Sequence, residues 1–271
     1  MRVASLHLYP VKSAAGHAVN ELSFDERGPV GDRRLMLVTT QGHFITQRTH
    51  PRLALVRAGL DAAVLTLATP DGATVTQALP REGPLLSVKI FRDTIDVLPV
   101  PGPASQLCSD FLGTACMLVA VDPRTAREAS TADGRRYPIS LVDAWPLLVT
   151  SRASLAAISA RLGQTLPLER FRPNIVLEPL AEMSDESLAH AEDRAARLHA
   201  EGIELVFGKT CSRCTIVDVD PATGAVDAGP LEALGALRGE ATFGAYFAAR
   251  CTRPLRRGDV LEVDWRGPAE G

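Results

Sequence analysis

The sequence predicts a mainly β protein with some α-helix, built in two parts. Short segments of alternating hydrophobic residues recur along the chain, turn-forming residues separate them, and helical periodicity is confined to a few stretches. The 271 residues, 46% of them hydrophobic, suffice for one large β-rich unit or two smaller domains. Strands this short and frequent are typical of a barrel or a sandwich.

Strand patterns dominate the first third of the chain. The predicted strands are residues 3–9, 35–39, 43–47, 53–56, 63–68, 86–91 and 94–98. Thr40-Gln41-Gly42 predicts a hairpin between the second and third strands, Pro70-Asp71-Gly72 follows the fifth, and Arg92-Asp93 joins the last two.

A run rich in proline, residues 99–103, interrupts this pattern and is followed by a predicted helix at 104–112 and a strand at 116–121. We therefore expect a domain boundary near residues 100–125 and divide the chain into 1–120 and 121–267. Ser151 is a good N-cap for a helix that runs through Leu162, with Gly163 at its end.

The rest of the second half is also predicted to be mainly β. Strands are expected at residues 172–177, 203–207, 215–219, 242–249 and 259–265, with a short helix at 231–237. Residues 188–200 fit either a helix or a loop followed by a strand.

Charge and apolar content exclude several classes of partner. The 29 basic and 32 acidic side chains give a net charge of −3, which offers no general attraction to nucleic acid or to an anionic membrane. No apolar run approaches the roughly 18 residues of a membrane span, and the first residues lack a signal-peptide pattern. We therefore expect a soluble, cytoplasmic protein whose five cysteines are reduced.

Two of these cysteines stand three residues apart in Cys211-Ser212-Arg213-Cys214. The motif follows a predicted strand and Gly208, which places it on a connection at a sheet edge. Because the fixed charge of Arg213 favours thiolate over thiol, a nucleophile or a soft-metal ligand is expected here.

Three interpretations of this motif compete. A structural zinc site needs about four ligands, and the chain has no second cysteine pair and no closely spaced histidine pair. A thioredoxin-like dithiol would begin a helix, whereas Thr215, Ile216 and Val217 favour a strand. A single thiolate that binds a cofactor is the third.

The motif and the residues after it resemble the MOSC domain, in the branch that contains the mitochondrial amidoxime-reducing component and its bacterial relatives. The matching residues are Cys211 to Cys214, Asp218, Val219, Asp220, Pro221, Thr223 and Gly224. Further segments resemble the family in the same order: Tyr9-Pro10-Val11-Lys12-Ser13, Gly31-Asp32-Arg33 with Met36, Phe44-Ile45-Thr46-Gln47-Arg48, Asp143-Ala144-Trp145-Pro146, Ser154-Leu155 and Phe171-Arg172-Pro173-Asn174-Ile175.

The resemblance implies an N-terminal β-barrel and a MOSC β-barrel with a molybdenum cofactor of the molybdopterin type at their junction. It implies that Cys214 is the protein ligand of the molybdenum, that Cys211 is a neighbour, and that Asp143 is an acidic catalytic residue near the metal. By analogy, the phosphate and pterin of the cofactor would be held by Lys12, Ser13, Arg33, Arg172, Asn174, Ser212 and Arg213. Cations and donors of this kind suit a phosphate, which a guanidinium engages through two hydrogen bonds.

Plainer interpretations of the same residues stay open. On composition alone, Lys12 and Arg33 would be solvated surface charges, and Asn174 would shape a turn. Asp143 would be a turn aspartate before Trp145. The chain also departs from the family, because Ala195 stands where relatives have a tryptophan and Gly31 replaces an apolar residue; these departures concern packing and pocket shape.

The implied reaction is reductive removal of oxygen from small N-hydroxylated compounds, such as hydroxylamines, amidoximes and N-hydroxylated bases. No glycine-rich dinucleotide motif and no iron–sulfur spacing of cysteines is present. Electrons would therefore come from a separate flavoprotein or a haem or iron–sulfur protein, and no nucleic-acid or membrane partner is expected. The alternative is a non-catalytic carrier that holds the molybdenum cofactor or sulfur on Cys214.

Overall fold

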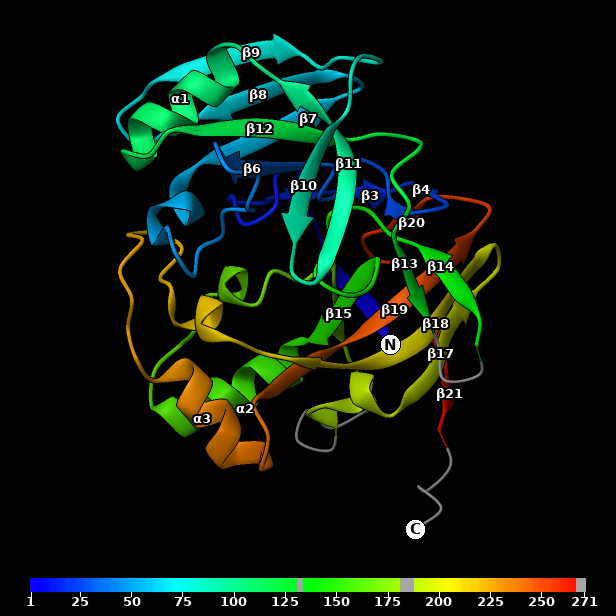
Figure 1. The fold of residues 1–271 in the computed structure, drawn as a ribbon. Coiled ribbons are helices and arrows are strands. Elements are labelled where there is room, and N and C mark those ends of the chain that lie inside the picture. Colours follow the sequence, from blue (N-terminus) through cyan, green and yellow to red (C-terminus); the bar gives the residue numbers. More distant parts are fainter. Residues whose placement is uncertain (131–133, 181–187, 267–271) are drawn as a thin grey trace.

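A computed structural model describes residues 1–130, 134–180 and 188–266, and within them the chain is mainly β with some α-helix, as predicted (Figure 1). Its largest sheet has the strand order β2-β1-β16-β15-β19-β18-β17-β21. The bounds of these strands are His17–Val19 (β2), Arg2–Leu8 (β1), Ile175–Glu178 (β16), Leu147–Ser151 (β15), Thr242–Cys251 (β19), Ile203–Ser212 (β18), Ala195–Ala200 (β17) and Glu262–Trp265 (β21).

The first strand of the chain belongs to the sheet of the second half. β1 pairs antiparallel with β16, with Leu6 opposite Ile175, and the N-terminus lies among the second-half strands in Figure 1. β2 follows β1 in the same sheet, and β6 (Leu35–Thr39) is the first strand along the chain to join a separate four-stranded sheet. The division into residues 1–120 and 121–267 stays a prediction, and its last residue lies outside the described part of the chain.

Smaller sheets make up the rest of the fold. One has the order β10-β11-β12-β6, with bounds Leu86–Ile90, Asp93–Val100, Cys116–Val121 and Leu35–Thr39, and another joins β7 (Arg57–Asp61), β8 (Val64–Ala68) and β9 (Thr74–Ala78). Short pairs link β3 (Glu21–Leu22) to β20 (Leu255–Arg256), β4 (Phe24–Asp25) to β5 (Gly28–Pro29), and β13 (Glu128–Ser130) to β14 (Arg136–Pro138).

The three predicted helices are confirmed. Helix α1 (Pro103–Leu112) covers β9 and β12, while α2 (Arg152–Leu162) and α3 (Pro230–Arg238) pack side by side below the large sheet (Figure 1). The Ser151 side chain accepts a hydrogen bond from the Ser154 backbone N–H at the start of α2, at 3.1 Å. Gly163 ends the helix at φ 68°, a left-handed conformation that suits glycine.

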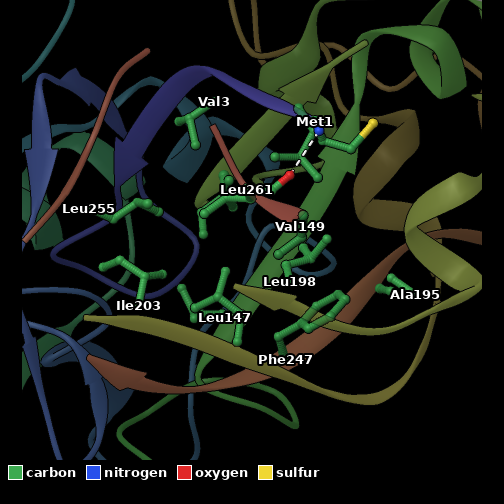
Figure 2. Packing of buried hydrophobic residues seen from close by; sticks show 14 of the residues in the cluster. Met1, Val3, Leu147, Val149, Ala195, Leu198, Ile203, Phe247, Leu255 and Leu261 are labelled. Carbon is green, nitrogen blue, oxygen red and sulfur yellow. Dashed lines mark hydrogen bonds between the residues drawn. The ribbon is translucent and has the colours of Figure 1, made fainter. Parts of the chain in front are cut away.

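Buried apolar side chains from the strands of the large sheet pack together in one continuous cluster (Figure 2). Leu147 and Val149 of β15 meet Phe247 of β19 and Leu198 of β17 there. The Met1 amino group lies at the border of this cluster and donates to the Leu261 carbonyl at 2.9 Å. Burial of these side chains stabilises the strands, and the strands in turn position the loops of the second half.

Two predicted strands are 3-10 turns instead. Pro51–Leu55 forms one because Pro51 begins the turn and buries Leu53 and Ala54 on one side. Thr215–Asp218 forms the other: Ile216 and Val217 are buried, and the Asp218 carboxylate accepts the Leu231 N–H at 2.9 Å. Tertiary contacts outweigh the weak strand preference of β-branched residues at both places.

Other element bounds also differ from the predictions. The turn at Thr40-Gln41-Gly42 forms, but residues 43–47 make only isolated bridges, so the strand predicted there is wrong. The strand predicted from residue 172 begins at Ile175, because Arg172 has φ 56° and Pro173 follows it. Residues 188–200 form a 3-10 turn at Ala191–Asp193 and then β17, the loop-and-strand alternative.

None of the helices within the described residues is long and apolar enough to cross a membrane.

Candidate cofactor site

One pocket collects the nine residues that the family resemblance assigns to the cofactor, the metal or catalysis. Its lining includes Lys12, Ser13, Arg33, Asp143, Arg172, Asn174, Ser212, Arg213 and Cys214. Lys12, Ser13 and Arg33 come from the first half of the chain and the others from the second. Ser154, which belongs to another segment that resembles the family, lies in α2 and donates to Glu192 at 2.7 Å. It is not among the lining residues.

Loop conformation brings these residues together. The backbone is left-handed at Ser13 (φ 66°), Arg33 (φ 46°) and Arg172 (φ 56°), a conformation that residues other than glycine seldom adopt. Such strain persists only where surrounding contacts hold it, and it concentrates at functional sites. Three strained residues around a single pocket therefore mark it as a built site.

The ring of Tyr9 separates two of the arginines. The Arg33 and Arg172 guanidinium carbons lie 4.2 and 4.4 Å from its centroid, one cation–π contact for each. Burial raises the pKa of Tyr9 to about 12, so the ring stays neutral. Burial, and then the nearby charge of Arg33, lowers the pKa of Arg172 to about 10.

Arg33 and Asn174 make their hydrogen bonds within the protein. Arg33 donates to Asp32 at 2.6 Å, to the Asn174 side-chain oxygen at 3.1 Å and to the Arg172 carbonyl at 2.8 Å. The Asn174 amide nitrogen donates to the His7 carbonyl at 3.2 Å, and its oxygen also accepts the Leu148 N–H. These two side chains therefore fix the loops of the pocket.

Arg172 and Arg213 retain free donor atoms. Arg172 donates to the Ala14 carbonyl at 2.5 Å, and Arg213 donates to the Cys211 sulfur at 2.9 Å and to the Phe171 carbonyl at 2.9 Å. Within the described residues, Arg172 Nη2 and Arg213 Nε are buried and without a hydrogen-bond partner. A buried guanidinium nitrogen without an acceptor is costly, so both atoms fit a bound anion.

Lys12 and Asp143 form an ion pair at the pocket wall. Lys12 is 4% exposed, and burial lowers its pKa although Asp143 opposes this. Burial raises the pKa of Asp143, but the charge and hydrogen bond of Lys12 and the charge of Arg48 outweigh it and bring the pKa down to about 2. Asp143 is therefore an ionised acceptor at neutral pH and not a proton donor.

The two cysteines of the motif differ in environment. Cys211 is fully buried at the end of β18, where it accepts the hydrogen bond from Arg213. Cys214 follows at the start of the 3-10 turn, half-buried, and faces the pocket. The described residues include no group of three or more His, Cys, Asp or Glu side chains that could hold a metal ion.

Sequence reasoning missed three contributors to the site. Tyr9 and Arg48 lie inside segments that resembled the family, but no role was expected for either side chain. Arg48 donates to the Cys214 sulfur at 3.4 Å across 166 residues of sequence, a separation that no motif spacing reveals. Tyr246 lines the pocket from β19, and burial and then Cys211 raise its pKa well above the usual value.

Gly16 supports the Tyr9 ring, and its replacement by alanine is expected to destabilise the protein. A Cβ at residue 16 would lie 2.3 Å from Tyr9 Cε1, so the ring between the arginines must move. We expect a loss of about 1–3 kcal/mol in the free energy of unfolding, measured with urea. Gly59→Ala is the matched control, because its Cβ meets nothing within 4 Å. Equal losses in both variants would contradict this packing argument.

The fold is mainly β, and the Cys214 side chain stands at the wall of a pocket lined by several cationic side chains, which is the class of site that suits an anionic ligand. The comparisons agree: residues 1–115 match the MOSC N-terminal beta barrel domain, and residues 136–262 match the MOSC domain. This chain belongs to the MOSC-domain family.

Named relatives cover most of the chain. Mitochondrial amidoxime-reducing component 1 of Mus musculus is 31% identical over 96% of this chain and 81% of its own length, and component 2 of Homo sapiens is 29% identical over 96% and 82%. Molybdenum cofactor sulfurase of Danio rerio is 25% identical over 93% of this chain but 32% of its own length. A solution structure from Bordetella bronchiseptica matches 39% of the chain with a TM-score of 0.31, too low to support an argument.

Proposed function

We propose that the chain binds a molybdenum cofactor of the molybdopterin type between its two halves and reduces N-hydroxylated compounds. One observation carries the proposal: the Cys214 thiol opens into a pocket where two buried guanidinium nitrogens, Arg172 Nη2 and Arg213 Nε, have no partner among the described residues. The names of the amidoxime-reducing relatives support the choice of reaction.

Each residue has a role in this proposal. Cys214 would bind the metal, and Arg172, Arg213, Ser212 and Ser13 would hold the phosphate and the pterin. Arg33 and Asn174 would position the loops through their internal hydrogen bonds. Asp143 would hold Lys12 in place beside the cofactor and accept hydrogen bonds as an anion. The bound cofactor supplies two-electron redox chemistry.

The reaction breaks the N–O bond of the substrate. Two electrons and two protons enter, an N–H bond forms and water leaves, so that an amidoxime becomes an amidine. The electrons come from a separate flavoprotein, haem protein or iron–sulfur protein. A cytoplasmic location stays a prediction.

The test is to produce the protein in a host that makes the cofactor, measure molybdenum per chain, and assay benzamidoxime reduction with a reduced dye. We expect close to one molybdenum per chain and dye-dependent formation of benzamidine. Zinc in place of molybdenum would overturn the proposal.

The second candidate is a carrier that holds the cofactor or sulfur on Cys214 without turnover. Similarity to the molybdenum cofactor sulfurase favours it. The same preparation separates the two functions, because a carrier would contain molybdenum and yet reduce neither hydroxylamines nor amidoximes.

The cofactor-loaded chain is expected to leave NADH and NADPH unoxidised in the absence of a second protein. The sequence has no dinucleotide-binding motif and no iron–sulfur spacing, so nothing in it divides a hydride into two single electrons. Absorbance at 340 nm, followed with benzamidoxime present, measures this. Steady nicotinamide consumption that depends on substrate would show that the chain holds a second redox centre.

A further inference from the structure

Phe44, Phe91 and Arg48 form a wall beside the pocket that the proposed function does not use. The two phenyl rings are 4.8 Å apart between centroids and inclined at 56°. The Arg48 guanidinium carbon lies 5.9 Å from the Phe44 ring and 5.5 Å from the Phe91 ring. We call these three residues the aromatic wall.

Two contacts join the aromatic wall to the pocket. Arg48 Nη1 lies 3.4 Å from the Cys214 sulfur. On the other side, the Lys12 ammonium lies 5.3 Å from the Phe91 centroid and 6.0 Å from that of Phe44. Because Lys12 and Cys214 both line the pocket, the wall borders the pocket beside these two residues.

Phe91 is an unusual residue for its position. It lies in the two-residue connection between β10 and β11, where Ile90 pairs with Asp93, and it has φ 55°. Such positions favour glycine or asparagine, and a bulky side chain there is strained. Phe91 is also 45% exposed, so burial does not account for an aromatic residue at this position. An exposed aromatic residue with a strained backbone, beside the cations Lys12 and Arg48, is consistent with a role in ligand contact.

We propose that the aromatic wall selects N-hydroxylated substrates whose reacting group is attached to a flat aryl or heteroaryl ring. The open surface of Phe91 stacks on that ring, and the planar guanidinium of Arg48 packs against it while its contact with Cys214 sets the distance to the reacting group. An alkyl substituent offers no flat π-face and gains less from the wall. The inference rests on the proposed function and names the substrate class for it.

Binding without turnover tests the proposal. Benzamidoxime and acetamidoxime carry the same reacting group on a phenyl and a methyl group, and ligand-detected NMR on oxidised, molybdenum-loaded protein without an electron donor gives a Kd for each. For Phe91→Leu and for Phe44→Leu we expect the preference for benzamidoxime to fall about 5- to 10-fold, the size of one aromatic stacking contact. Arg48→Lys, which keeps the charge but loses the plane, is expected to lower the preference in the same direction.

Phe111→Leu is the matched control, because Phe111 also lies under an arginine, Arg52 at 4.4 Å, but on α1, whereas the two rings of the wall lie beside Lys12 of the pocket. An unchanged preference in the Phe91 and Phe44 variants, or the same change in Phe111→Leu, overturns the aromatic wall. So does wild-type protein that binds neither probe. If binding depends on the ring but no dye-driven reduction occurs, the role of the aromatic wall is supported and the proposed reductase activity is overturned.

Discussion

Cys214→Ser is expected to lower dye-driven reduction of benzamidoxime by about 100-fold or more, because loss of a metal ligand costs at least as much as loss of the groups that orient one. Serine keeps the shape of the side chain but gives a poor soft-metal ligand. Cys214 is half-buried and faces the pocket, so the substitution removes little core packing. Molybdenum per chain and the rate should be measured on the same preparation.

Cys211→Ser is the control for this prediction. Cys211 is fully buried and accepts the hydrogen bond of Arg213 at 2.9 Å, and a serine oxygen can accept that bond too. We expect a substantial fraction of the activity to remain. Equal losses of activity in the two variants would contradict the assignment of Cys214 as the single ligand and would favour the dithiol interpretation.

Removal of the cations is expected to weaken cofactor retention more than it weakens the fold. Arg172→Ala deletes the unpartnered Nη2, and Lys12→Ala deletes the buried ammonium beside Asp143. A charge-assisted hydrogen bond contributes roughly 1.5–3 kcal/mol, so each loss should weaken binding by about 10- to 150-fold. Molybdenum content after dialysis measures this.

The cofactor-free variants should keep a Tm within about 4 °C of the parent chain, which corresponds to roughly 1 kcal/mol in a protein of this size. Burial already disfavours the charge of Arg172, whose pKa falls to about 10, and Asp143 keeps the nearby charges of Arg48 and Arg33 when Lys12 is removed. Arg152→Ala is the control, since that side chain is 60% exposed and pairs with Glu178 on the surface. Full molybdenum occupancy in the Arg172 and Lys12 variants would show that these cations do not hold the cofactor.

Local patterns in the sequence predicted much of the fold. Ser151 and Gly163 bound α2 as expected, because a cap is formed by residues that are near neighbours in sequence. Thr215, Ile216 and Val217 were assigned to a strand because only their β-branching is visible in the sequence. They form a turn because the Leu231 N–H donates a hydrogen bond to the Asp218 carboxylate and because the Ile216 and Val217 side chains are buried. Both interactions exist only in the folded chain.

The same distinction applies to the site. Motif resemblance predicted which residues surround the pocket, and all nine line it. It did not distinguish residues whose side chains hydrogen-bond to other parts of the protein, such as Arg33 and Asn174, from residues with a donor atom that has no partner, such as Arg172. Only the folded structure distinguishes these cases, because most of the hydrogen-bond partners belong to segments that are distant in sequence.

The pairing of β1 with β16 constrains the order in which a ribosome-bound chain reaches its final form. Leu6 must wait for Ile175 to be synthesised, and contacts between such distant residues close late and slowly. Lys12 and Ser13 follow directly on β1, so they cannot take their final positions until much of the second half has emerged. A cofactor that contacts both halves can therefore bind in its final position only after the residues that line the pocket have been synthesised.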